Sequence, residues 1–214
     1  EETARLQRDG LYDAAFEHDA CGVGFVAALD GKPRRQVVEA GVDALKAVWH
    51  RGAVDADGKT GDGAGIQLQI PQDFFKQHII RTGHETGTGR LAVGMVFLPK
   101  TDLGAAEVCR AIVESEILNF GYRIFGWRQV PINSAIIGEK ANATRPEIEQ
   151  IMIANEEGVA EAQFERDLYI IRRQIEARVR DAQVADFYIC SLSCRSIVYK
   201  GMFLAEQLSA FYPD

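Results

Sequence analysis

One apolar run, residues 91–98, constrains the fold of this chain more than any other feature. Its sequence, LAVGMVFL, contains no polar side chain and shows no alternation of polar with apolar positions. A strand with one face in solvent alternates, whereas a continuously apolar strand must be covered on both faces. The run therefore predicts a sheet with packed layers on both sides.

One-sided helical patterns supply candidates for those layers. Apolar residues recur at helical spacing, with charged residues elsewhere, from Val38 to Trp49 and in residues 72–80, 103–118 and 161–179. Gly121 is placed to end the third of these helices in a left-handed conformation. Further strands are expected at residues 21–29, 65–70, 122–130, 148–154, 186–192 and 196–204. Strands interleaved with such helices imply helix-covered sheets, but periodicity alone does not choose between a doubly wound sheet and two stacked sheets.

Composition excludes several classes of protein. With 214 residues, 47% hydrophobic and 26% charged, the chain has the make-up of a soluble globular domain. Its net charge of −7 argues against a nucleic-acid partner, because such affinity is built from clustered Lys and Arg. No apolar run approaches the roughly 20 residues that span a bilayer, and no secretory signal is evident. We expect a cytoplasmic protein that does not enter a membrane.

The four cysteines form neither a CxxC motif nor a paired metal signature, so we expect reduced thiols and no metal. Cys109, Cys190 and Cys194 lie in or beside apolar helix or strand patterns and are expected to be buried and inert. Cys21 differs, because it lies at the junction between the polar residues 1–20 and an apolar run.

The glycine-rich stretch HRGAVDADGKTGDGAG, residues 50–65, suggests a phosphate-binding loop at first sight. Its Gly-Lys-Thr at 58–60 copies the end of a Walker A motif. In that motif four residues separate a first glycine from the Gly-Lys pair, and Ala53 stands at the position of that glycine. The stretch also follows a helical pattern rather than a strand, so a nucleotide site is disfavoured.

A calcium loop is the second reading of the same stretch. Asp55 and Asp57 could begin an EF-hand loop, but its fifth and sixth positions require an oxygen ligand and a glycine. Lys59 and Thr60 occupy those positions. A solvated turn rich in Gly and Asp therefore stays open as the simplest interpretation.

Cys21 carries a chemical possibility that the other cysteines lack. If the chain were cut after Ala20, this residue would hold both a thiol and a free α-amine. The amine titrates near pH 7.7–8.0 and a thiol near 8.5, so the amine can take the proton as the sulfur attacks. Gly22 and Gly24 would let a substrate approach closely. Taken alone, a cysteine that starts an apolar strand is more often a core residue, and both readings stay open here.

Longer sequence segments decide whether Cys21 is a nucleophile or a core residue. In order, they are HDACGVGF, AVWHRGAVDADGKTGDGAG, AVGMVFLP, GWRQVP, EKANATRPEIEQIMI, DFYICSLS and IVYKGMFL. Together they resemble the N-terminal glutaminase domains of the large (α) chains of bacterial glutamate synthases, over essentially the whole chain. The Cys-Gly start followed by His-Arg-Gly is common to class II glutamine amidotransferases. The resemblance implies an α+β fold, the N-terminal-nucleophile hydrolase αββα sandwich of two antiparallel sheets between helix layers. It also implies a leader at residues 1–20 and the N-terminal part of the amidotransferase domain at 21–214.

The resemblance implies roles for individual residues. Cys21 would be the nucleophile, and its freed α-amine the base. Arg51 would lie near the nucleophile, where a guanidinium donates hydrogen bonds in a fixed fork; a surface ion pair is its alternative role. His50 is interpreted as a structural hydrogen-bonding residue. In shorter relatives an Asp-x-Ala-Gly follows the Arg-Gly almost at once, and residues 62–65 look like its counterpart, so that Gly52 and Asp62 would belong to a wall of the amide pocket.

The implied reaction is hydrolysis of L-glutamine to glutamate and ammonia through a thioester on Cys21, with the ammonia channelled to 2-oxoglutarate. This segment itself would hold no cofactor. FMN and a 3Fe-4S cluster would lie in the rest of the large chain, and FAD, 4Fe-4S clusters and NADPH on a small (β) subunit, with NADPH favoured over ferredoxin. A higher oligomer is expected. The family's Asn-Gly oxyanion pair does not occur here, so we expect these residues to be part of a longer polypeptide.

Two alternatives accompany this interpretation. The chain could serve another class II amidotransferase with a different ammonia acceptor. It could also be a catalytically silent domain that serves assembly.

Overall fold

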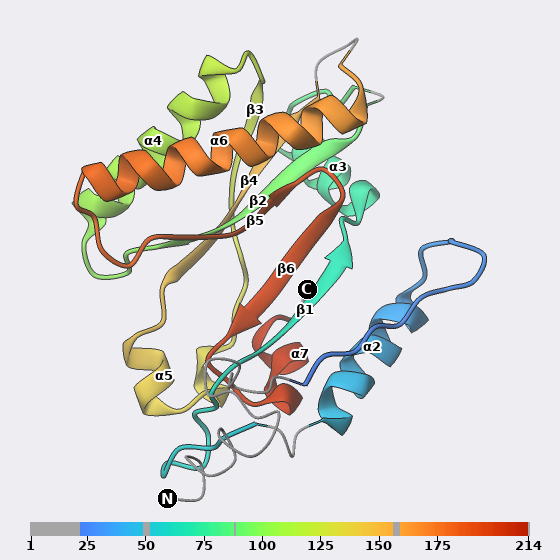
Figure 1. The fold of residues 1–214 in the computed structure, drawn as a ribbon, viewed down its shortest axis with the longest axis vertical. Coiled ribbons are helices and arrows are strands. Elements are labelled where there is room, and N and C mark those ends of the chain that lie inside the picture. Colours follow the sequence, from blue (N-terminus) through green and yellow to red (C-terminus); the bar gives the residue numbers. More distant parts are fainter. Residues whose placement is uncertain (1–21, 49–51, 88, 156–158, 214) are drawn as a thin grey trace, which may run out of the picture.

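A computed structural model describes residues 22–48, 52–87, 89–155 and 159–213, which form two antiparallel sheets with helices packed against them (Figure 1). This confirms the α+β fold with two antiparallel sheets. The larger sheet contains, in spatial order, β3 (Ile124–Gln129), β4 (Glu147–Ala154), β2 (Leu91–Leu98) and β5 (Tyr188–Ser193). The smaller sheet pairs β1 (Ala64–Gln69) with β6 (Ser196–Gly201).

Strand β2 is a central strand of the larger sheet, as its apolar run predicts. It is hydrogen-bonded to β4 on one side and β5 on the other. Its side chains alternate between two separate cores, with Ala92 and Val96 in one and Val93 and Met95 in the other. Gly94 leaves room between the strands, because a Cβ there would lie 2.8 Å from Ile151 Cγ2 and 3.0 Å from Leu192 Cδ1.

Two long helices, α4 (Leu103–Asn119) and α6 (Glu161–Asp181), cover one face of this sheet (Figure 1). Asp102 caps α4 by accepting a hydrogen bond from the Ala105 N–H at 2.9 Å. Beyond the end of α4, Gly121 adopts φ +84°, the left-handed conformation that its position predicts. The predicted apolar stripe of α6 is fully buried; it comprises Phe164, Leu168, Ile171, Ile175 and Val179.

The opposite face of the larger sheet packs towards the smaller sheet and the remaining helices. Helix α3 (Gln72–Arg81) buries Phe75 and Ile79 in this core, and α2 (Arg35–Ala47) packs beside β1 through partly buried Val42 and Leu45. Four short helical elements occur among the described residues: η3 (Ser134–Ile136), α5 (Glu139–Ala143), η4 (Ala205–Gln207) and α7 (Leu208–Phe211). The sequence patterns did not predict these four, because a single helical turn is too short to show a period.

The predicted buried strand at residues 21–29 is wrong for its described part. Residues 22–28 have no regular structure, and the exposed fractions of Val23, Phe25 and Leu29 are 90%, 95% and 107%. An apolar run becomes a strand only when it pairs with a neighbouring strand. Among the described residues no strand pairs with it.

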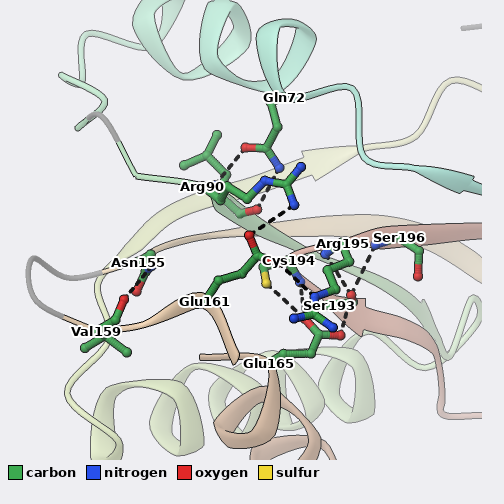
Figure 2. A network of polar contacts seen from close by, with 11 residues as sticks. Gln72, Arg90, Asn155, Val159, Glu161, Glu165, Ser193, Cys194, Arg195 and Ser196 are labelled. Atoms are coloured by element: carbon green, nitrogen blue, oxygen red, sulfur yellow. Dashed lines mark hydrogen bonds and ion pairs between the residues drawn. The ribbon is translucent and has the colours of Figure 1, made fainter. Parts of the chain in front are cut away.

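A carboxylate on α6 fixes the turn at which the chain passes from the larger sheet to the smaller (Figure 2). Glu165 accepts hydrogen bonds from Ser193 Oγ at 2.6 Å, from the Cys194 N–H at 2.9 Å and from Cys194 Sγ at 3.0 Å. Burial raises the pKa of Glu165, but the hydrogen bonds from Cys194 and Ser193 outweigh it, so the pKa ends below its ordinary value. The ionised form therefore stabilises the fold.

We expect the Glu165→Gln variant to lower the free energy of unfolding by about 1–2 kcal/mol at pH 7, because an amide accepts these hydrogen bonds more weakly than a carboxylate. The difference from the wild type should be complete above the ordinary glutamate pKa of about 4.3. It should shrink as the pH falls through the lowered pKa of the folded state. Urea unfolding at several pH values measures both effects.

Glu176→Gln is the matched control, since Glu176 lies on the same helix and pairs with Arg172 and Arg173 near the surface. Such pairs are worth a few tenths of a kcal/mol. An equal decrease in the free energy of unfolding in the two variants would contradict the role assigned to Glu165.

Candidate functional site

A cavity of about 1450 Å³ lies between the glycine-rich segment, the β1–β6 sheet, α5 and the segment that follows β6. Apolar walls come from Ile66, Ile148 and Phe211, and polar groups from residues such as Arg145 and Glu206. A concave site with mostly apolar walls and a few polar groups is the usual form of a small-molecule pocket. This cavity is the candidate site.

Two of the predicted site residues, Gly52 and Asp62, line this cavity. Gly22, the chain neighbour of Cys21, lines it as well. Cys21, His50 and Arg51 lie outside the described residues, so the roles assigned to them stay predictions. The described neighbours of Cys21 and Arg51 thus border one and the same space.

The glycine-rich segment is a hairpin rather than a phosphate-binding loop. Val54 and Gly61 form a β-bridge, and the backbone N–H groups of Lys59 and Thr60 both donate to Asp57 Oδ1, at 2.9 and 2.7 Å. In a P-loop such N–H groups bind phosphate. Here an internal carboxylate already accepts hydrogen bonds from these N–H groups, so they are not free to bind a phosphate.

The two hairpin carboxylates are likewise engaged within the protein. Lys140 Nζ donates to Asp55 Oδ2 at 2.6 Å, and this interaction holds the pKa of Asp55 below its usual value. Hydrogen bonds from Thr60, led by that of its side-chain hydroxyl at 2.6 Å, lower the pKa of Asp57. Both carboxylates are therefore ionised at neutral pH and directed at protein donors.

Sequence reasoning missed part of the cavity wall. Ala141 and Thr144, from α5 and the residue that caps its C-terminus, line the cavity, as do Phe203 and Leu204 after β6. These residues belong to the words EKANATRP and IVYKGMFL, which carry the family resemblance. These two segments indicated the family but not the site, because nothing in their local sequence pattern shows that they face the glycine-rich segment.

The three described cysteines are poor nucleophiles. Cys109, Cys190 and Cys194 are free and buried, as predicted. Burial raises the pKa of all three thiols, to about 11 for Cys190 and, with the help of the neighbouring Glu165 carboxylate, to about 12 for Cys194. The thiolate is the reactive form of cysteine, so these side chains are unreactive at neutral pH.

The family model described as "Glutamine amidotransferases class-II" matches residues 21–214. The chain belongs to this family. The match begins at Cys21 and includes every residue that lines the cavity.

Individual relatives of this amidotransferase chain are glutamate synthases. It is 68% identical over 211 residues to the large chain of an NADPH glutamate synthase from Azospirillum brasilense, covering 99% of this chain and 14% of that protein. It is 44% identical over 199 residues to ferredoxin-dependent glutamate synthase 2 of Synechocystis sp., covering 92% and 12%. The NADPH glutamate synthase large chain of Bacillus subtilis is 39% identical over 209 residues, covering 96% and 13%. The chain therefore spans about one seventh or less of the length of these relatives.

The described part of this amidotransferase chain has no group of three or more His, Cys, Asp or Glu side chains that could hold a metal ion. Within the same residues, no helix is long and apolar enough to cross a membrane.

Proposed function

We propose that this chain is the glutaminase part of a glutamate synthase, which hydrolyses L-glutamine and passes the ammonia to 2-oxoglutarate to make L-glutamate. The observation that carries the proposal is the 68% identity to the large chain of an NADPH glutamate synthase, within a class II amidotransferase match that starts at Cys21. NADPH is accordingly the proposed electron donor of the whole protein.

Cys21, with its α-amine freed by removal of residues 1–20, supplies both nucleophile and base. The amine takes the thiol proton while the sulfur attacks the amide carbon of glutamine. The C–N bond then breaks, and ammonia leaves with that proton. Water hydrolyses the γ-glutamyl thioester, which releases glutamate and restores the thiol. The high pKa values of the buried Cys190 and Cys194 support Cys21 as the nucleophile.

Other residues bind and orient the substrate in this proposal. Arg51 orients groups around the thiol through its fork of donors, and His50 holds the local backbone by hydrogen bonding. Gly52 and Asp62 belong to the wall of the glutamine pocket, which their place along the cavity supports. Pre-positioned groups of this kind lower the barrier by holding the amide near the attacking sulfur.

The remaining parts of the proposal concern the whole protein. Residues 1–20 form a removable leader, and residues 21–214 form the N-terminal part of the amidotransferase domain. The described residues do not fit an iron–sulfur cluster, since no set of metal ligands gathers among them. By the family resemblance, FMN and 3Fe-4S are assigned to the rest of the large chain, and FAD and 4Fe-4S to a small subunit. The assembly is a cytoplasmic oligomer.

Covalent labelling tests the proposed nucleophile. The full-length polypeptide beginning at Cys21 is incubated with a diazoketone analogue of glutamine and analysed by intact mass and peptide mapping. We expect one adduct, on Cys21, that excess glutamine prevents. Cys109, Cys190 and Cys194 serve as internal controls, since their burial protects them. An unlabelled protein, or an adduct on any of these three, would exclude the proposed mechanism.

A further inference from the structure

The cavity has one wall that is a separate folded unit, residues 53–62, called here the 53–62 hairpin. Its ends are joined by a hydrogen bond from the Asp62 N–H to the Ala53 carbonyl at 3.2 Å, and its centre by one from the Asp55 N–H to the Thr60 carbonyl at 2.9 Å. The Asp57 carboxylate caps the turn from inside. These hydrogen bonds make the hairpin a unit that is held together by its own contacts.

Helix α5 holds the tip of the hairpin by charge and by contact. Lys140 Nζ lies 2.6 Å from Asp55 Oδ2, the ion pair that links the two segments. Gly138, at the N-terminal cap of α5, lies directly against the turn. A Cβ at that position would be 2.8 Å from the Thr60 backbone nitrogen and would overlap the Asp57 carboxylate and the Thr60 hydroxyl.

The core holds the opposite side of the hairpin. A Cβ on Gly61 would lie 2.6 Å from the Phe203 carbonyl carbon and 2.8 Å from the Leu204 nitrogen. Phe203 is 1% exposed and belongs to the core between the sheets. The hairpin is thus fixed between α5 on one side and the segment after β6 on the other.

Both ends of the hairpin lead into the candidate site. Gly52 immediately precedes it and Asp62 closes it, and both line the cavity. From this arrangement we infer that Gly138 and Lys140 are positioning residues for the glutaminase reaction. By fixing the hairpin they set the position of the cavity wall that Gly52 and Asp62 form, and hence the affinity for glutamine. The inference rests on the proposed function and deepens it.

A charge exchange tests the ion pair. Asp55→Lys and Lys140→Asp each place two like charges together, and each should raise the KM for glutamine about three- to fivefold while kcat stays within twofold. The double variant restores opposite charges and should return the KM towards the wild-type value. Lys59→Met is the control for a change of charge in the hairpin itself, because Lys59 forms no salt bridge that the structure describes. It should leave the KM unchanged.

Gly138→Ala tests the contact. Gly138 has φ −66° and ψ 159°, which any residue adopts, so an added methyl group acts only by displacing the hairpin. We expect the KM to rise about tenfold or more, with faster hydrogen exchange at the Asp55 and Asp62 amides. Gly87→Ala is the matched control, because a Cβ there meets nothing within 4 Å. Thermal unfolding of each variant shows whether the fold is retained.

The outcomes separate this inference from the function on which it rests. A wild-type protein that hydrolyses glutamine, together with an unchanged KM in the single charge variants and in Gly138→Ala, would overturn the inference and leave the function standing. A double variant whose KM for glutamine stays as high as those of the two single charge variants would also overturn the inference. A wild-type protein that neither hydrolyses glutamine nor takes the diazoketone label would overturn both.

Discussion

The Cys21→Ala variant should lose glutamine hydrolysis by about a thousandfold or more, because it keeps the α-amine and removes the sulfur that forms the thioester. Glutamine binding should change little, since the pocket walls are untouched. Ammonia release measures the first effect, and isothermal titration calorimetry with glutamine measures the second. Both are made on the full-length polypeptide that begins at position 21.

Cys109→Ala provides the comparison. Cys109 is fully buried on α4, in the core on the side of the larger sheet away from the cavity, and its thiol pKa is raised by burial. Its removal should lower the stability by about 1–2 kcal/mol through the space it leaves, without changing kcat. Hydrolysis by Cys21→Ala at a rate near that of the wild type would place the nucleophile elsewhere in the chain.

Much of the secondary structure follows from local pattern. The bounds of β2 coincide with the predicted run, and the apolar stripe of α6 is buried at each predicted position. The β2 prediction succeeds because a continuously apolar run needs only apolar neighbours on both faces. The α6 prediction succeeds because that segment is long enough to show its helical period. The left-handed Gly121 succeeds for a different reason, since the backbone conformation after α4 favours glycine.

The pairing of strands is not contained in those patterns. Strand β1 pairs with β6, so that Ala64 lies opposite Gly201, far along the chain. The fully buried Gln150 likewise has no sequence signal. It accepts a hydrogen bond from Arg128 and donates one to Tyr199 at 3.1 Å, on the other sheet. Such partners are brought together only by the fold, which the family resemblance implied and which periodicity left open.

The candidate site divides in the same way. Cys21 was identified as a candidate nucleophile from the chemistry of a single residue, its thiol and its α-amine. Gly52 and Asp62 were identified from a motif of the family. Gly138 had no such signal, because its contact with the 53–62 hairpin depends on a close approach between distant segments. A glycine before a short helix is indistinguishable, in sequence alone, from an ordinary helix cap.

Retention of residues 1–20 should lower glutamine hydrolysis about a hundred- to ten-thousandfold, the range that general acid–base catalysis contributes. With the leader attached, the Cys21 nitrogen is an amide and has no basic lone pair. In the trimmed form the rate should rise with pH as the α-amine loses its proton near its ordinary pKa of 7.7–8.0, because only the neutral amine accepts the thiol proton. In the form that keeps residues 1–20, the rate should not show this increase with pH. Rates from pH 6 to 9 on both forms, with the rest of the polypeptide identical, measure the difference.

A third form of the polypeptide shows whether the leader acts by blocking the Cys21 α-amine or by occupying the site. A chain that begins at Ala20 blocks the Cys21 amine with one small residue, which leaves the rest of the leader out of the site. If the amine is the base, this form should be as inactive as the one with all 20 residues, although the cavity beside Gly22 stays open. Full activity of the Ala20 form would show that the leader acts by occupying the site, and that some other group takes the proton from the sulfur.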